Sequence, residues 1–329
     1  MTLVVHDEPM DQSNPTTSAR APRVRRAVRR AGVSFGVLAA VTLVAAVPSG
    51  AATLERANRC ASPAPKTTVA YRRLPGAAAD ATSLDVYAPA RACRAPVVMW
   101  VHGGGYHIGD KASQVRDKVR LFNARGWLFA SVNYRLTVKG DPNSAHYPDH
   151  YDDVAAAVAW VNTHIARLGG DASRVALLGH SAGADIVSNV ATNPRYLRTH
   201  HLGLRAIACA GPLDTEGFDK VTADAGAGEE RAMWLDALGN APDFERTTSA
   251  ITWIRPHVGI PQTISVVRGT PQRRGIEQDY LDRLAAAGVR TTRIDASGLS
   301  HADVNRRIGA PGDTVMTPPL MKFLDRCLR

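Results

Sequence analysis

The stretch Gly179-His180-Ser181-Ala182-Gly183 decides how the rest of the chain is interpreted. It follows residues 174–178, a short apolar run that is typical of a buried parallel strand, and it precedes residues 184–191, which have the composition of a helix. A serine between small residues at a strand–turn–helix junction is typical of a nucleophile elbow. The glycines lack a Cβ, so neighbouring backbone can pack close to the turn. The sequence therefore predicts that Ser181 is a nucleophile.

A glycine-rich loop follows the predicted central strand at residues 96–101. It reads His102-Gly-Gly-Gly-Tyr106. Consecutive glycines allow backbone N–H groups to face inward, where they can stabilise a developing oxyanion. We expect the N–H groups of Gly104, Gly105 and Ala182 to form this oxyanion hole. A phosphate-binding loop is excluded, because neither GxxxxGK[ST] nor GxGxxG occurs in the chain.

A serine nucleophile needs a base, because a hydroxyl is a poor nucleophile until its proton is removed. Among eleven histidines, His301 follows the last predicted strand, at residues 291–295, and comes after the nucleophile in chain order. We therefore expect His301 to be the base. His180, the variable residue of the elbow, is expected to point away from the nucleophile, and His102 is expected to brace the glycine loop.

The order of elements predicts an α/β fold. Apolar strand-like runs alternate with helical patterns between residues 71 and 327, which favours a mostly parallel sheet covered by helices on both faces. Residues 53–329 are expected to form a single domain, which starts with an extension at 53–70. Residues 215–258 show no clear strand and are expected to form a short lid-like excursion over the site.

Taken together, several motifs resemble one family. The chain is similar to α/β-hydrolases of the hormone-sensitive-lipase-like group of bacterial carboxylesterases. The residues that carry the resemblance are 102–106 with Gly109-Asp110-Lys111, Asn133-Tyr134-Arg135-Leu136, Pro148 with Asp152-Asp153-Val154, Ala157 to Val161, residues 169–175, the elbow and His301. The resemblance implies the α/β-hydrolase fold, with Ser181 as nucleophile, His301 as base, and Gly104, Gly105 and Ala182 as oxyanion donors.

The chain departs from this group at the catalytic acid. The group usually places the acid in the loop after the strand expected at residues 263–268, but residues 269–274 (Gly-Thr-Pro-Gln-Arg-Arg) contain no carboxylate. Two candidates remain, Asp214, which we favour, and Glu277 as the alternative. A strand is expected at residues 204–210 after the elbow helix, and Asp214 ends the region of this strand. Glu277 lies at an expected helix start, where it could instead complement the helix dipole.

The net charge does not indicate a nucleic-acid partner. The formal charge is +10, and six arginines against three acidic residues place +3 of it within residues 1–52. The rest is scattered, without a basic run or interleaved aromatic residues.

The N-terminus is typical of an exported protein. Residues 1–52 combine an arginine-rich region, an uncharged apolar core at 33–47 and small residues at the exit, as in a secretory signal peptide. We therefore expect a secreted protein without stable membrane insertion, or a membrane-anchored one if residues 33–47 are not cleaved. The sequence does not distinguish Sec from twin-arginine export.

Export permits disulfides. Cys60 and Cys93 flank the first predicted strand and are expected to pair. For Cys209 two interpretations remain: a buried free thiol, or a bridge to Cys327.

The leading functional hypothesis is a secreted serine hydrolase that cleaves small-molecule carboxylic esters through an acyl-enzyme. No metal or cofactor is implied, and the oligomeric state is not indicated. Two alternatives remain: an arylformamidase-like amide hydrolase, which related enzymes suggest, and a non-catalytic binding protein on a hydrolase scaffold, which the missing acid would favour.

Overall fold

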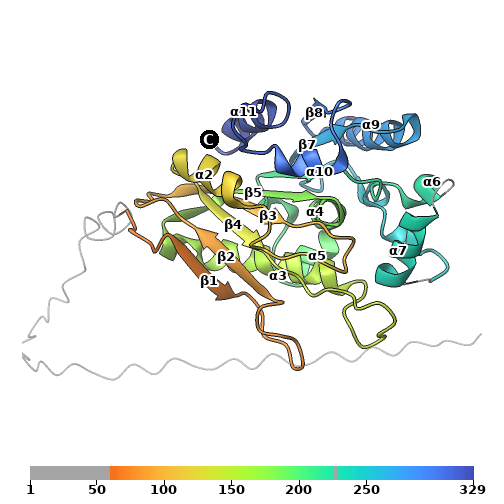
Figure 1. The fold of residues 1–329 in the computed structure, drawn as a ribbon, viewed down its shortest axis with the longest axis horizontal. Helices are drawn as coiled ribbons and strands as arrows, with labels where there is room; N and C mark the ends of the chain where they lie inside the picture. Colours follow the sequence, from red (N-terminus) through yellow and green to blue (C-terminus); the bar gives the residue numbers. More distant parts are fainter. Residues whose placement is uncertain (1–59, 225–227, 240) are drawn as a thin grey trace, which may run out of the picture. The chain divides into compact units, whose positions relative to one another are not determined.

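The computed structural model describes residues 60–224, 228–239 and 241–329. Within them, eight strands form one sheet in the order β1-β2-β4-β3-β5-β6-β7-β8 (Figure 1). β1 pairs antiparallel with β2, and β2 with β4, whereas the other neighbours are parallel. The sheet is therefore mostly parallel, as predicted. The strands are β1 (Lys66–Ala70), β2 (Ser83–Tyr87), β3 (Ala95–Val101), β4 (Leu128–Val132), β5 (Gly170–His180), β6 (Cys209–Leu213), β7 (Gln262–Val267) and β8 (Thr291–Asp295).

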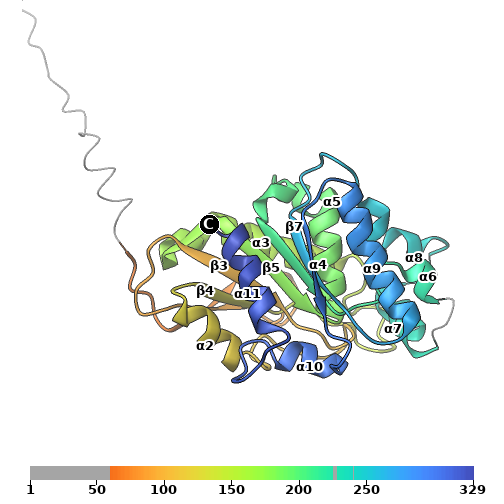
Figure 2. The ribbon, with the colours of Figure 1, turned by 90° about the horizontal axis from the view of Figure 1, so that it is seen from above.

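Helices cover both faces of the sheet because the central strands are apolar on both sides. In β3, Val97 and Met99 belong to one core, whereas Val98 and Trp100 belong to the other, as the alternation of a strand requires. The first core packs against α3 (Asp149–His164), α4 (Ala182–Thr192), α5 (Pro194–Arg198) and α9 (Pro271–Ala286). The second packs against α2 (Arg116–Ala124), α10 (His301–Arg306) and α11 (Thr317–Cys327) (Figure 2).

Two strands differ from the sequence-based expectation. The expected extension at 53–70 contains β1, which pairs with β2 at the antiparallel edge. The strand expected at 204–210 is divided into a 3₁₀ turn at Leu204–Ala206 and β6, which begins only at Cys209. An apolar run alone does not fix where a strand begins. The shift matters for the site, because β6 now ends at Leu213 and Asp214 follows it directly.

The excursion at residues 215–258 is helical in its described part. It comprises α6 (Lys220–Asp224), α7 (Glu229–Leu238), α8 (Phe244–Thr247) and a 3₁₀ turn at Ala250–Trp253. Lys220 ties it to the core: its ammonium lies 2.8 Å from Asp185 Oδ1 of α4, and both side chains are buried. The same ammonium donates to the carbonyls of Gly217 and Thr248. The excursion is therefore fixed to the helix that follows the elbow.

This buried pair predicts a large effect on stability. In Lys220→Ala, the Asp185 carboxylate would remain buried without its cation, and we expect the free energy of unfolding to fall by about 3–5 kcal/mol. The matched control is Arg246→Ala, which removes an exposed pair with Asp243 in the same excursion and is expected to cost about 1 kcal/mol or less. Urea unfolding of both variants measures the difference, and equal losses would contradict this role for Lys220.

Two disulfides join the four cysteines. Cys60 pairs with Cys93, as predicted. Cys209 of β6 pairs with Cys327 of α11, so the interpretation of Cys209 as a free thiol is wrong. The second bridge joins the C-terminal helix α11 to β6, the strand that Asp214 follows.

The expected signal peptide at 1–52, with its apolar core at 33–47, lies outside the described residues. Within the described part of the chain, no helix combines the length and apolarity needed to span a bilayer.

Candidate active site

Ser181 lies in a sharp turn between β5 and α4. Its backbone has φ 57° and ψ −125°, a conformation that L-residues rarely adopt and that is often found at functional sites. The flanking glycines make the turn possible. A Cβ on Gly179 would lie 2.4 Å from the carbonyl oxygen of Gly183, and a Cβ on Gly183 would lie 2.3 Å from that of Val101. The predicted elbow is therefore present in the structure.

The glycine loop passes close to this turn. A Cβ on Gly103 would lie 2.8 Å from the Cβ of Ser181, and Gly104 has φ +114°, with no room for a side chain beside Ile108. Within the described residues, the N–H groups of Gly104 and Gly105 donate to no backbone carbonyl. Ala182 is the first residue of α4, so its N–H has no acceptor within the helix. These are the three N–H groups that the sequence predicts as oxyanion donors.

His301 is hydrogen-bonded to Asp214. His301 begins α10, and its Nδ1 lies 2.7 Å from Asp214 Oδ2. The His301 side chain is 44% exposed, whereas the Asp214 side chain is fully buried. Burial alone would raise the pKa of Asp214, but the hydrogen bond with His301 and the charge of Arg273 outweigh it and hold this pKa below its usual value. A buried carboxylate that stays ionised can orient an imidazole ring and stabilise its charged form.

Glu277, the other acid candidate, has different partners. It lies within α9 rather than at its start, and it accepts hydrogen bonds from the backbone N–H of Arg268, at 2.7 Å, and from Arg273 Nε, at 3.2 Å. Burial raises its pKa to about 8, despite these two hydrogen-bonding partners. In the structure, Asp214 therefore contacts His301, whereas Glu277 contacts Arg268 and Arg273.

Arg273 lines the cavity beside Ser181 and contacts Asp214, although the sequence interpretation did not single it out. Its Nη2 lies 2.6 Å from Asp214 Oδ1, the oxygen that does not face His301, and its Nη1 lies 2.8 Å from Glu216 Oε1. Arg268 Nε lies 3.4 Å from Asp214 Oδ2. The signal was present in the sequence: the region after β7 that lacks the expected carboxylate is rich in arginine.

His180 contacts His301 and therefore belongs to the surroundings of the site. The two rings are 4.5 Å apart, and His180 Nε2 lies 2.8 Å from the carbonyl oxygen of His301. Burial, together with the nearby His301, lowers the pKa of His180 to about 3, so the ring is neutral and can brace the start of α10. His102 braces the glycine loop as expected, with Nδ1 2.8 Å from the carbonyl oxygen of Gly103.

His180, Asp214 and His301 also form the one group in the described chain whose spacing could suit a metal ion, with ligand atoms within 4.8 Å of one another. Their atoms are already engaged, however. His301 Nδ1 faces Asp214, and His180 Nε2 faces a backbone carbonyl. The group therefore fits a hydrogen-bonded array better than a metal centre.

Two cavities adjoin Ser181, and Gly105 and His301 line both of them. The smaller, of about 130 Å³, extends toward the excursion. The larger, of about 380 Å³, extends toward α10 and the glycine loop. An ester bound at Ser181 could therefore place one arm in each. The smaller cavity is further lined by Tyr106, Ala182, Asp214, Thr215, Glu216, Glu230, Met233, Trp234 and Arg273, and the larger by Trp100, His102, Gly103, Gly104, Ile108, Gly109, Ser113, Gln114, His180, Ala302 and Asn305.

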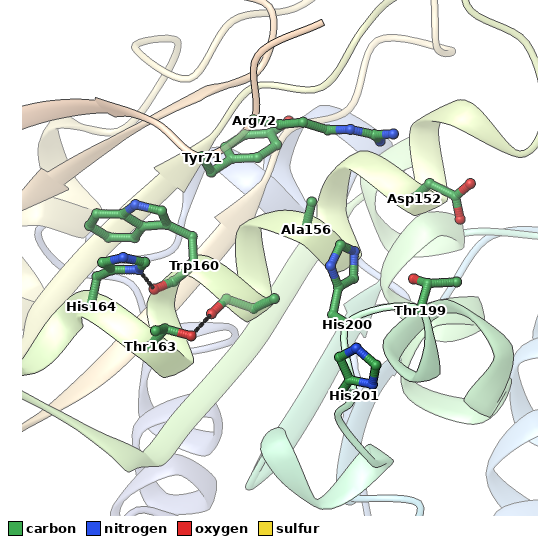
Figure 3. A pocket seen from close by; sticks show the side chains of 11 residues that line it. Tyr71, Arg72, Asp152, Ala156, Trp160, Thr163, His164, Thr199, His200 and His201 are labelled. Atoms are coloured by element: carbon green, nitrogen blue, oxygen red, sulfur yellow. Dashed lines mark hydrogen bonds between the residues drawn. The ribbon is translucent and has the colours of Figure 1, made fainter.

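A more open cavity of about 660 Å³ lies elsewhere and shares no lining residue with these two. Figure 3 shows Trp160 stacked on His164 at one side of it, with His200 and His201 on another segment. It contains none of the predicted site residues.

The sequence that forms this site matches a known protein family. The sequence model of the carboxylesterase family matches residues 50–218, which include the glycine loop, the elbow and Asp214. The chain belongs to the carboxylesterase family. His301 lies beyond the matched residues, so its place beside Asp214 comes from the structure alone.

Individual members of the carboxylesterase family match part of the chain. Carboxylesterase 1E of Mus musculus is 34% identical over 149 residues, which cover 43% of this chain and 25% of that protein. The para-nitrobenzyl esterase of Bacillus subtilis is 28% identical over 142 residues, covering 41% and 29%. The chain thus spans about a quarter of the length of the curated relatives it matches.

Solved esterase structures share the fold. A bacterial heroin esterase aligns with a TM-score of 0.61 at 22% identity, covering 75% of this chain and 80% of that chain. Propionate-bound esterase 2 of Thermogutta terrifontis aligns with a TM-score of 0.60 at 21% identity, covering 80% and 92%. These similarities confirm the predicted α/β-hydrolase fold.

Proposed function

We propose that this chain is an exported serine hydrolase that cleaves carboxylic esters through an acyl-enzyme on Ser181. The observation that supports it most is the hydrogen bond of 2.7 Å between His301 Nδ1 and the buried Asp214, beside a serine held in a strained turn. The non-catalytic alternative depended on a missing acid. The contact between His301 and Asp214 removes that argument.

In the proposed acylation step, His301 Nε2 takes the proton of the Ser181 hydroxyl as Oγ attacks the ester carbonyl carbon. Asp214 holds the ring so that Nδ1 carries its proton, and it stabilises the imidazolium that forms. The N–H groups of Gly104, Gly105 and Ala182 would bind the oxyanion, and losing one such donor typically costs about 3–4 kcal/mol. His301 then donates its proton to the departing alkoxide, which leaves as the alcohol.

Deacylation repeats the same chemistry with water. His301 takes a proton from a water molecule, whose oxygen attacks the acyl carbon, and the proton is then returned to Ser181 Oγ as the carboxylic acid leaves. The cycle is complete with this chain's own residues, so the mechanism calls for no metal or cofactor. The partner is a small-molecule ester.

The proposal includes export of the protein from the cell. It is supported by the two disulfides, which are typical of oxidising compartments, and by the composition of residues 1–52. N-terminal sequencing of the protein from culture medium tests it: we expect a start near residue 52. A protein that starts at residue 1 and stays with the membrane would favour the anchored alternative.

Hydrolysis of p-nitrophenyl esters from acetate to decanoate tests the activity. We expect turnover that falls as the acyl chain lengthens if the acyl arm enters the smaller cavity, because about 130 Å³ leaves room for only a short group. An aryl formamide measured in parallel tests the amide alternative. A formamide cleaved faster than every ester would replace the ester proposal with that alternative.

A further inference from the structure

The smaller cavity beside Ser181 is lined by two carboxyl side chains that the proposed chemistry does not use. Glu216 follows β6, and Glu230 lies in the first turn of α7. Met233 and Trp234, also from α7, are among the apolar residues of the wall. A substrate arm that enters this cavity therefore lies close to the carboxyl groups of Glu216 and Glu230.

These acids belong to a cluster in which carboxyl groups outnumber cations. Around Arg273, four carboxyl groups lie within 4 Å of one guanidinium: Asp214 at 2.6 Å, Glu216 at 2.8 Å, Glu277 at 3.2 Å and Glu230 at 3.8 Å. Arg268 adds a second cation, but it faces Asp214. Glu230 has the longest of these contacts, so it is the carboxyl group of the cavity that the arginines satisfy least.

The protonation of the cluster agrees with a shortage of positive charge. Burial, and next the hydrogen bond with Glu216, raise the pKa of Glu230 to about 7. A buried oxygen of Glu230, Oε2, has no hydrogen-bond donor among the described residues. The Glu230 side chain is 43% exposed, and near neutral pH a proton shared with Glu216 replaces part of the missing positive charge.

We propose that Glu230 and Glu216 select esters in which one short arm ends in an ammonium group, which pairs with these carboxyl groups in the cavity beside Ser181. This inference rests on the proposed esterase function and narrows its substrate class. A primary ammonium group donates hydrogen bonds to both carboxylates and a tertiary one to a single carboxylate, and either charge completes the pairing that Arg273 leaves unfinished. Met233 and Trp234 limit the arm to a few atoms.

The test compares isosteric esters that differ only in charge. For the acyl arm, β-alanine ethyl ester is compared with ethyl butyrate. For the alcohol arm, 3-(dimethylamino)propyl acetate is compared with 4-methylpentyl acetate. Both amines stay protonated between pH 6 and 8. The quantity measured is the ratio of kcat/KM for the charged ester to that for its neutral isostere, in which effects of pH common to both esters cancel.

For one of the two arms, we expect the ratio to reach about tenfold or more at pH 8, since hydrogen bonds to charged groups are strong. The ratio should fall as the pH drops below 7, because protonation of Glu230 removes the negative charge that attracts the ammonium. In Glu230→Gln the ratio should fall about tenfold at pH 8 and become independent of pH. Asp243→Asn removes an exposed carboxylate of the same excursion and should leave the ratio unchanged.

The outcomes separate this inference from the proposed function. A protein that hydrolyses the neutral esters but gives the same ratio with and without the Glu230 carboxylate overturns the inference and leaves the esterase standing. A protein that hydrolyses none of the four esters overturns both.

Discussion

Ser181→Ala should abolish ester hydrolysis, with kcat lower by about 10⁶-fold, because the variant has no nucleophile and His301 has no proton to take. The residual rate would come from the oxyanion donors and from binding alone. The fold should be unaffected, because alanine fits wherever serine does, and the turn depends on the space left by Gly179 and Gly183. Hydrolysis of p-nitrophenyl acetate by parent and variant measures the effect.

Ser188→Ala is the matched control. Ser188 lies in the same helix, α4, and its hydroxyl donates to the carbonyl of Asp185, away from the two cavities at the elbow. We expect its kcat to stay close to that of the parent, because Ser188 lines neither of these cavities. A Ser181→Ala variant as active as this control would show that the nucleophile is a different residue.

Asp214→Asn should lower kcat by about 10⁴-fold. The amide cannot stabilise the imidazolium of His301, and it favours the ring tautomer with the proton on the wrong nitrogen. Glu277→Gln should lower activity by less than about tenfold, since Glu277 contacts Arg268 and Arg273 and not His301. The two variants measured on the same ester distinguish the two acid candidates.

Each acid variant also needs a check of its fold, because both carboxyl groups contact buried arginines. Circular dichroism and the unfolding midpoint provide it. If folded Glu277→Gln loses activity while folded Asp214→Asn keeps it, the assignment of the acid is reversed. If neither loses activity, His301 acts without a carboxylate partner.

Local motifs were the part of the site that the sequence could predict. The elbow and the glycine loop each occupy a few consecutive residues after an apolar strand, and glycine is required there because a Cβ would collide with backbone 1.9–2.4 Å away at Gly104, Gly179 and Gly183. Such constraints are visible in the sequence itself. His301 was also predictable, because the parallel sheet brings the carboxyl ends of its strands to one edge.

Contacts between distant segments could not be predicted. The choice between Asp214 and Glu277 depends on where β6 ends, and the apolar run at 204–210 suggested an earlier strand than the one formed at Cys209–Leu213. Arg273 and Glu230 come from two further segments, α9 and α7, and their relation to Asp214 exists only after packing. His180 was expected to point away from Ser181, but nothing in the sequence indicated that it would brace His301.

The most direct test of the account is to treat the protein with diethyl p-nitrophenyl phosphate, which reacts with activated serines, and to locate the label by peptide mass spectrometry. The account predicts one diethylphosphoryl group on Ser181, released p-nitrophenol in equal amount, and loss of ester hydrolysis in proportion to labelling. A protein that remains unlabelled, or that carries the label on another residue and still hydrolyses esters, would contradict it.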